Sequence, residues 1–152
     1  MAKFDMEQTM AVAAIQQLIN DWAYDLDVNN GLSIRDLVTE DCTYAVGPAP
    51  REGREEVGAF YAARMERLTA QGGDFPVQRH LLSNLRVSFH AVDAASITFN
   101  LLYFSNAGMA AGVSHPDPVA VADVRMDCRR TAEGHWAIAT FDSAQCFRRT
   151  PA

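Results

Sequence analysis

The spacing of apolar residues changes once along this chain, near Pro76. Before that point the apolar residues recur at helical spacing, as in Met10, Ala14, Leu18, Trp22 and Leu26. Such spacing is typical of an amphipathic helix. After it, apolar and polar residues alternate as in a half-buried strand: Leu85, Arg86, Val87, Ser88, Phe89, His90. Helices followed by a run of strands favour an α+β domain.

The boundaries of the elements follow from the same patterns and from Gly, Pro and Asn signals. We expect helices over about 7–27, 32–38 and 54–71, and strands over 41–46, 77–90, 96–105, 119–131 and 135–147. Asn30 and Gly31 can supply the left-handed residue that ends the first helix. The predicted fold has N-terminal helices packed on a strongly bent, mostly antiparallel sheet. Together they form a cone-shaped α+β barrel that encloses a dead-end pocket.

Length and charge limit the class of protein. A chain of 152 residues has the size of one domain, here residues 1–152. Its net charge of −6 argues against a nucleic-acid partner and against a polybasic membrane contact. No apolar run approaches the roughly 18 residues of a membrane helix. We also expect a cytoplasmic protein, because no signal peptide is evident and the three cysteines form no C-x-x-C pair.

Two distant residues are the candidates for chemistry. Asp27 closes the first predicted helix, and His80 opens the strand that follows the third. A carboxylate hydrogen-bonded to an imidazole is a general base that needs no metal or nucleotide. Each residue also has a plainer interpretation from sequence alone. Asp27 could be a solvated acid at a helix end, and His80 a half-buried strand histidine.

The sequence lacks the common signatures of metal and cofactor sites. No His/Asp/Glu cluster has metal-ligand spacing, and neither G-x-x-x-x-G-K-[ST] nor G-x-G-x-x-G occurs. The nucleophile elbow G-x-S-x-G is absent as well. We therefore expect no metal and no cofactor, and a reaction carried out by side chains.

Several stretches carry a family likeness over nearly the whole chain. They include Ile15-Gln16-Gln17-Leu18, Gly53-Arg54-Glu55-Glu56, Arg79-His80-Leu81-Leu82-Ser83-Asn84 and Gly134-His135-Trp136. In this order they resemble the SnoaL-like group of the nuclear-transport-factor-2-like superfamily. The likeness is closest to the branch with scytalone dehydratase and hexachlorocyclohexane dehydrochlorinase. Two departures from the dehydratase are Asn100, in place of a second His, and Leu26, in place of a Tyr.

The resemblance implies roles for particular residues. Asp27 and His80 fall on the positions of that branch's catalytic pair, and Tyr44 on an aromatic position that lines its cavity. Candidate lining or substrate-binding residues are Tyr44, Asn100, Trp22, Tyr24, Phe60, Leu102 and Phe104. Trp22 and Tyr24 also fit a core role. His115 could belong to a lid, and the position of Arg129 and Arg130 relative to the pocket stays open.

The predicted function is that of a cofactor-independent lyase acting on a small aromatic or phenolic hydroxy compound. It would eliminate water or a small aldehyde, with Asp27 orienting His80 as the base. One alternative is an isomerase or cyclase in which Asp27 alone moves the proton. Another is a non-catalytic member that only binds a small ligand. The resemblance also implies a homo-oligomer, a trimer or a dimer, formed through the outer sheet face.

Overall fold

A curved six-stranded sheet with helices on one side makes up the protein, for which the computed structural model describes residues 3–72, 75–107 and 117–148. The helical elements are α1 (Met6–Asn29), the short 3₁₀ turn η1 (Ile34–Asp36) and α2 (Arg54–Gln71). The strands are β1 (Val38–Tyr44), β2 (Arg51–Glu52), β3 (Gln78–Ala91), β4 (Ala94–Ser105), β5 (Ala120–Arg130) and β6 (Trp136–Arg148). The predicted α+β class is confirmed.

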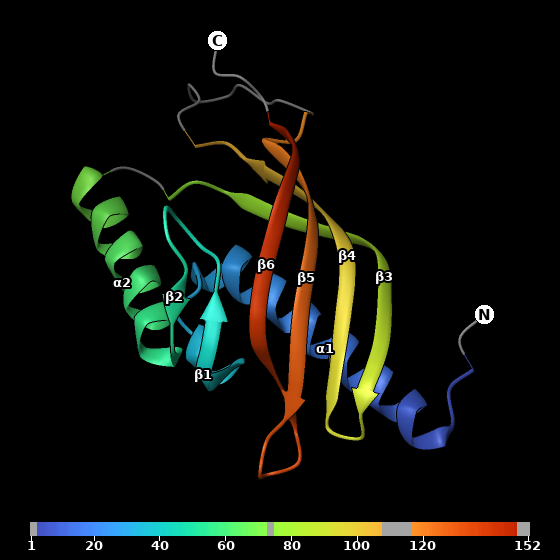
Figure 1. Ribbon diagram of the computed structural model, residues 1–152. Helices are drawn as coiled ribbons and strands as arrows, with labels where there is room; N and C mark the ends of the chain where they lie inside the picture. The colour runs from blue at the N-terminus through green and yellow to red at the C-terminus, as the bar shows by residue number, and fades with distance from the viewer. Residues whose placement is uncertain (1–2, 73–74, 108–116, 149–152) are drawn as a thin grey trace.

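The strand order explains the cone shape. The sheet runs β2-β1-β6-β5-β4-β3, and β1 pairs with β6 in parallel while the other neighbours are antiparallel. The edge strands β2 and β3 do not pair with each other, so the barrel is open. In Figure 1, α1 crosses behind the long strands and α2 stands beside β1 and β2. On the opposite face of the sheet, the described part of the chain places no helix.

Capping residues determine where helix α1 begins and ends. At its start, Asp5 and Gln8 form a capping box. At its end, Asn30 adopts the left-handed conformation with φ 56°, as the sequence predicts. Its buried face, including Ile15, Ile19 and Trp22, packs in the main core. This packing places Asp27 in the last turn of the helix, beside β3.

Two local predictions were wrong. The segment predicted as a helix over 32–38 contains only the single turn η1, and β1 already begins at Val38. The Leu37 carbonyl accepts a hydrogen bond from the Ile138 N–H at 2.9 Å, which ties this segment to β6. Pairing with β6 therefore outweighs the short helical pattern. The two-residue strand β2 was also missed, because it follows a loop with Pro48 and Pro50.

A β-bulge in β3 shifts the alternation of its side chains between the two faces of the sheet. Asn84 has φ 57°, and the pairing with β4 shifts between Ser83 and Arg86. The extra residue lets both Leu82 and Leu85 pack against the core. The bend that a bulge introduces is a natural source of the strong curvature of the sheet.

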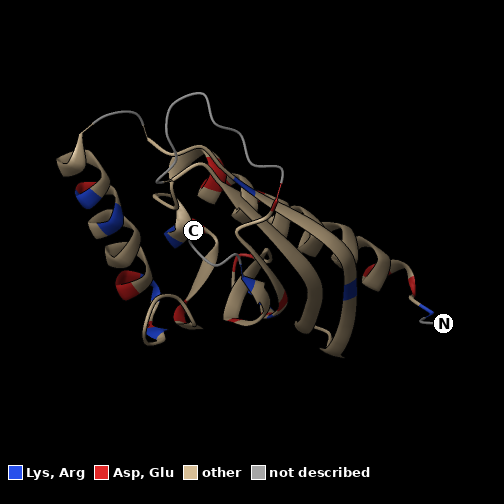
Figure 2. Ribbon diagram, turned by 90° about the horizontal axis from the view of Figure 1, so that it is seen from above, with Lys and Arg blue, Asp and Glu red and all other residues tan. Residues whose placement is uncertain are grey.

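Helix α2 carries charged residues of both signs, as Figure 2 shows. Its buried residues are Val57, Gly58 and Tyr61. Of the cysteines, Cys42 and Cys128 are buried and Cys146 is exposed. None of the helices in the described ranges is long and apolar enough to cross a membrane.

Candidate functional site

Asp27 and His80 meet at the junction of α1 and β3. The Asp27 Oδ1 atom lies 2.6 Å from His80 Nδ1. Both carboxylate oxygens also accept the backbone N–H of His80, at 3.1 and 3.0 Å. The two side chains are only 12% and 13% exposed. Residues 53 positions apart in sequence thus form a hydrogen-bonded pair that is shielded from water.

The environment of His80 favours its neutral form. Burial lowers the pKa of the imidazole, whereas the hydrogen bond and the charge of Asp27 raise it, and the net shift is downward. A neutral ring that donates Nδ1–H to Asp27 keeps the lone pair on Nε2. Nε2 is therefore the atom that can accept a proton from a bound molecule.

His80 lies in the wall of a pocket of about 600 Å³. Five aromatic residues and the loop from Ala45 to Pro50 are part of its lining. The centre of the His80 ring lies 4.8 Å from the centre of the Tyr103 ring and 5.9 Å from that of the Trp22 ring. The lining residues are Trp22, Leu26, Tyr44, Ala45, Val46, Gly47, Pro48, Ala49, Pro50, Tyr61, His80, Leu101, Tyr103, Phe141, Ser143 and Gln145.

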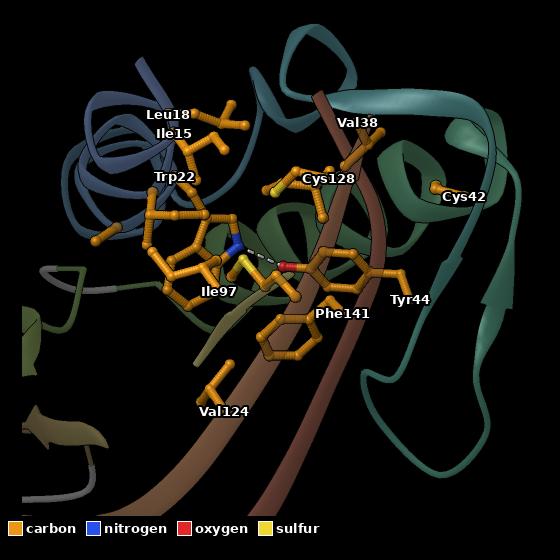
Figure 3. Close-up of a cluster of buried hydrophobic side chains, with 14 of the residues drawn as sticks. Ile15, Leu18, Trp22, Val38, Cys42, Tyr44, Ile97, Val124, Cys128 and Phe141 are labelled. Carbon is orange, nitrogen blue, oxygen red and sulfur yellow. Dashed lines mark hydrogen bonds between the residues drawn. The ribbon is translucent and has the colours of Figure 1, made fainter. Parts of the chain in front are cut away.

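Three lining residues form a hydrogen-bonded chain. The Trp22 indole N–H donates to the Tyr44 hydroxyl at 2.6 Å, the contact drawn in Figure 3. The hydroxyls of Tyr44 and Tyr61 lie 3.4 Å apart. Burial raises the pKa of Tyr44 well above its usual range and raises that of Tyr61 to about 12. Both phenols therefore stay neutral hydrogen-bond donors near neutral pH.

The family follows from a comparison of the sequence with family models. The model of the SnoaL-like domain matches residues 7–142. This chain belongs to the SnoaL-like family. No curated protein matches it in a sequence comparison.

Several solved structures have the same fold. Hexachlorocyclohexane dehydrochlorinase LinA-type3 from Novosphingobium barchaimii LL02 is similar to this SnoaL-like chain with a TM-score of 0.74 and 17% identity, over 96% of this chain and 93% of the other. A candidate scytalone dehydratase from Novosphingobium aromaticivorans has a TM-score of 0.69 and 18% identity, over 93% of this chain and 87% of the other. ActVI-ORFA from Streptomyces coelicolor has a TM-score of 0.70 and 16% identity, over 89% of this chain and 96% of the other. At these identities the likeness shows the fold alone.

Several predicted lining residues lie elsewhere in the SnoaL-like domain. Tyr24 is 64% exposed on the outer side of α1. Leu101 and Tyr103 line the pocket, so the alternating side chains of Asn100, Leu102 and Phe104 point to the opposite face of the sheet. There the Asn100 amide binds Asn84 and Asp123 at 2.7 Å each. These four residues therefore do not line the pocket that contains His80.

The remaining candidates have separate positions. Phe60 lies at a different hollow, where the Arg51 guanidinium is 5.2 Å from the centre of its ring. Arg129 and Arg130 line a hollow near the β5–β6 turn, far along the sheet from His80. His115 lies outside the described residues. Trp22 and Tyr44 are the two predicted lining aromatics that the structure brings together with Asp27 and His80.

Sequence reasoning missed Tyr61, Tyr103 and Phe141. Tyr61 lies in the helix predicted over 54–71, but nothing local shows that its hydroxyl meets Tyr44. Tyr103 lies opposite His80 across β3 and β4, so the two residues share a face of the sheet. Two register shifts in this pairing mean that the β3–β4 turn alone would not have given it. Within the described ranges, no cluster of three or more His, Cys, Asp or Glu side chains has the arrangement of a metal site.

Proposed function

We propose that this SnoaL-like protein is a lyase that eliminates water from a small, uncharged aromatic or phenolic hydroxy compound. The single observation that carries the proposal is the 2.6 Å contact between Asp27 and His80 at the wall of an aromatic pocket. Elimination needs a base at a carbon and a donor at an oxygen. The pocket offers candidates for both.

His80 acts as the base in this proposal. Its Nε2 atom removes a proton from a carbon of the substrate, and the electron pair of that C–H bond forms the new C=C bond as the C–O bond breaks. The imidazolium then gives its proton to the departing hydroxyl, which leaves as water. Asp27 holds the tautomer and stabilises the imidazolium, as the acid of a catalytic triad does. General-base catalysis of this kind contributes about 10²–10⁴-fold.

The donor for a substrate oxygen comes from Tyr44 and Tyr61. The two phenols have two O–H protons, and only one can lie in the bond between them. Trp22 adds a further donor to Tyr44 rather than an acceptor. One phenolic proton is thus left without an acceptor among the described residues. A carbonyl or phenol oxygen of the substrate would accept it, and the bond would strengthen as negative charge develops.

The charge of the pocket argues for an uncharged substrate. Apart from the tyrosines, His80 is the only titratable residue among the described lining residues, and none of them is Lys, Arg, Asp or Glu. A carboxylate or phosphate would be buried there without a cationic partner among the described lining residues, which is costly. The flat aromatic walls instead suit an aromatic ring.

The test is turnover of a panel of phenolic diols and hydroxy-ketones, followed by the appearance of conjugated ultraviolet absorption. Asp27→Asn and His80→Ala should each lose about 10²–10⁴-fold in kcat. Asp21→Asn and His135→Ala change the same residue types at exposed positions and should retain activity. Release of an aldehyde instead of water would show that the lyase eliminates a small aldehyde.

Other results would favour the alternative functions. An isomerase or cyclase that uses Asp27 alone would lose activity in Asp27→Asn and keep it in His80→Ala. A binding protein would hold ligands without turnover in every variant. Either result would overturn the proposed lyase.

A further inference from the structure

We propose that Gln78 is a positioning residue that sets the geometry of the Asp27–His80 pair by joining three elements around it. The inference rests on the proposed function for its catalytic meaning. Its structural part, that Gln78 fixes the contact between the two side chains, can be tested without a substrate. Gln78 does not line the pocket, and no sequence pattern marks it.

The first link runs from β3 to α1. Gln78 is 3% exposed, and its Nε2 atom donates to the backbone carbonyl of Leu26. Leu26 directly precedes Asp27, and Gln78 lies two residues before His80 on the same face of β3. The side chain of Gln78 thus connects the backbone of one partner to the strand of the other.

The second link runs from the same amide to α2 and β4. The Gln78 Oε1 atom accepts from Arg64 Nη2 at 3.0 Å and from the Tyr103 hydroxyl at 3.3 Å. The Tyr103 ring in turn packs on His80 with an angle of 31° between the ring planes. Oε1 therefore fixes the aromatic surface against which the imidazole rests.

The contacts also govern the charges around His80. The charged groups that act on its imidazole are Asp27 from α1 and Arg64 from α2, while β4 contributes the neutral Tyr103. Arg64 has a cationic head held by Gln78 and, at 3.5 Å, by Asn30. Its charge lowers the pKa of His80 and that of Tyr61. Releasing Arg64 from Gln78 would change the protonation of the base as well as its position.

Two substitutions separate these contacts. Gln78→Met keeps the length of the side chain and removes every hydrogen bond that the side chain makes. Gln78→Glu keeps acceptors for Arg64 and Tyr103 but loses the donor to Leu26, and it brings a negative charge toward His80. Gln17→Met changes an exposed glutamine on α1 and serves as the control.

The measurement is NMR of the His80 ring in the whole, unliganded protein. In the wild type and in Gln17→Met, we expect a Nδ1–H proton that exchanges slowly, because it is held by Asp27. In Gln78→Met that signal should broaden or vanish and the pKa of His80 should change. In Gln78→Glu the pKa should rise. We expect kcat to fall about 10–100-fold in Gln78→Met with a smaller change in KM, since small misplacements of a catalytic group have effects of this size.

The outcomes distinguish the two proposals. A thermal unfolding curve shows which variants are folded, and Gln78→Glu provides the test if Gln78→Met is not. Unchanged His80 signals and pKa in a folded variant would overturn the positioning role, whatever happens to turnover. Changed His80 signals in Gln78→Met, together with a wild-type protein that turns over no substrate, would support the positioning role and overturn the proposed function.

Discussion

Asp27 holds His80 at two places, the ring nitrogen Nδ1 and the backbone N–H, using the same carboxylate oxygen for both. The backbone bond fixes the strand against Asp27, and rotation of the imidazole would break the Nδ1 bond. A solvated helix-end acid would have no such constraint. The arrangement favours one tautomer, with Nε2 left for a substrate.

The first prediction concerns pH. Because burial lowers the pKa of His80 below 6.5, we expect kcat/KM to be constant near neutrality and to fall on the acid side, with an apparent pKa below 6.5. Asp27 raises this pKa, so Asp27→Asn should lower it further. An NMR titration of the ring in both proteins checks the shift directly.

The same shift has a consequence for stability. The unfolded chain binds a proton at His80 near pH 6.5, whereas the folded chain does so only at lower pH. The contribution of His80 to the free energy of unfolding is therefore fully present above pH 6.5. It is lost as pH falls through the folded pKa. A wild type whose His80 titrates above pH 6.5 would contradict both predictions.

The second prediction concerns the Trp22–Tyr44 hydrogen bond. Tyr44→Phe leaves the buried indole N–H without an acceptor, and an unsatisfied buried donor costs about 1–3 kcal/mol. We expect a decrease of that size in the free energy of unfolding, measured in urea. Tyr24→Phe removes a hydroxyl from an exposed tyrosine and should change it by less than about 0.5 kcal/mol. Equal effects of the two variants would contradict the assigned role of the bond.

Long, regular elements were the part of this fold that sequence could predict. The helical spacing of α1 and the stop at Asn30 and Gly31 place Asp27 within the last turn. The segment 32–38 was misassigned, because its structure is decided by pairing with β6, which no local pattern records. Short segments are governed by tertiary partners more than by their own propensity.

The site residues also differ in how far sequence could predict them. Asp27 and His80 could be predicted because each lies near the end of an element and falls on a position of the family resemblance. The assignment of Asn100, Leu102 and Phe104 to the pocket failed by a single step of alternation along β4. A strand with apolar residues on both faces gives no sequence signal for which face is inside. The pairing of His80 with Tyr103 resolves the choice in the structure.

The third prediction concerns Gly31, which lies beneath the Tyr61 ring. A Cβ atom at Gly31 would come within 2.3 Å of Tyr61 Cδ1, and the residue has φ +82°. Gly31→Ala should therefore both strain the backbone and displace a pocket residue. Gly134 has φ +89° with open space around it, so Gly134→Ala isolates the backbone effect of about 1–2 kcal/mol. We expect Gly31→Ala to exceed that loss in urea unfolding and to weaken ligand binding. Equal losses would show that Tyr61 moves aside freely.

The last prediction concerns the sheet face opposite the pocket. Leu81, Leu102, Val121 and Phe147 are direct cross-strand partners from β3 to β6, so they form one apolar row. Leu81 is 53% and Phe147 72% exposed. An exposed apolar row across four strands is typical of a protein–protein contact, and we propose a second copy of this chain as the partner.

We expect light scattering after gel filtration to give two or three times the protomer mass of 16.7 kDa. Leu81→Asp and Phe147→Asp place a charge in the row and should shift the mass toward that of one protomer, because an unpaired charge buried in an interface is strongly unfavourable. Val92 is 69% exposed in the β3–β4 turn, away from the row, and Val92→Asp should leave the mass unchanged. A monomeric wild type, or an assembly that tolerates both charges, would exclude this face as the contact between copies.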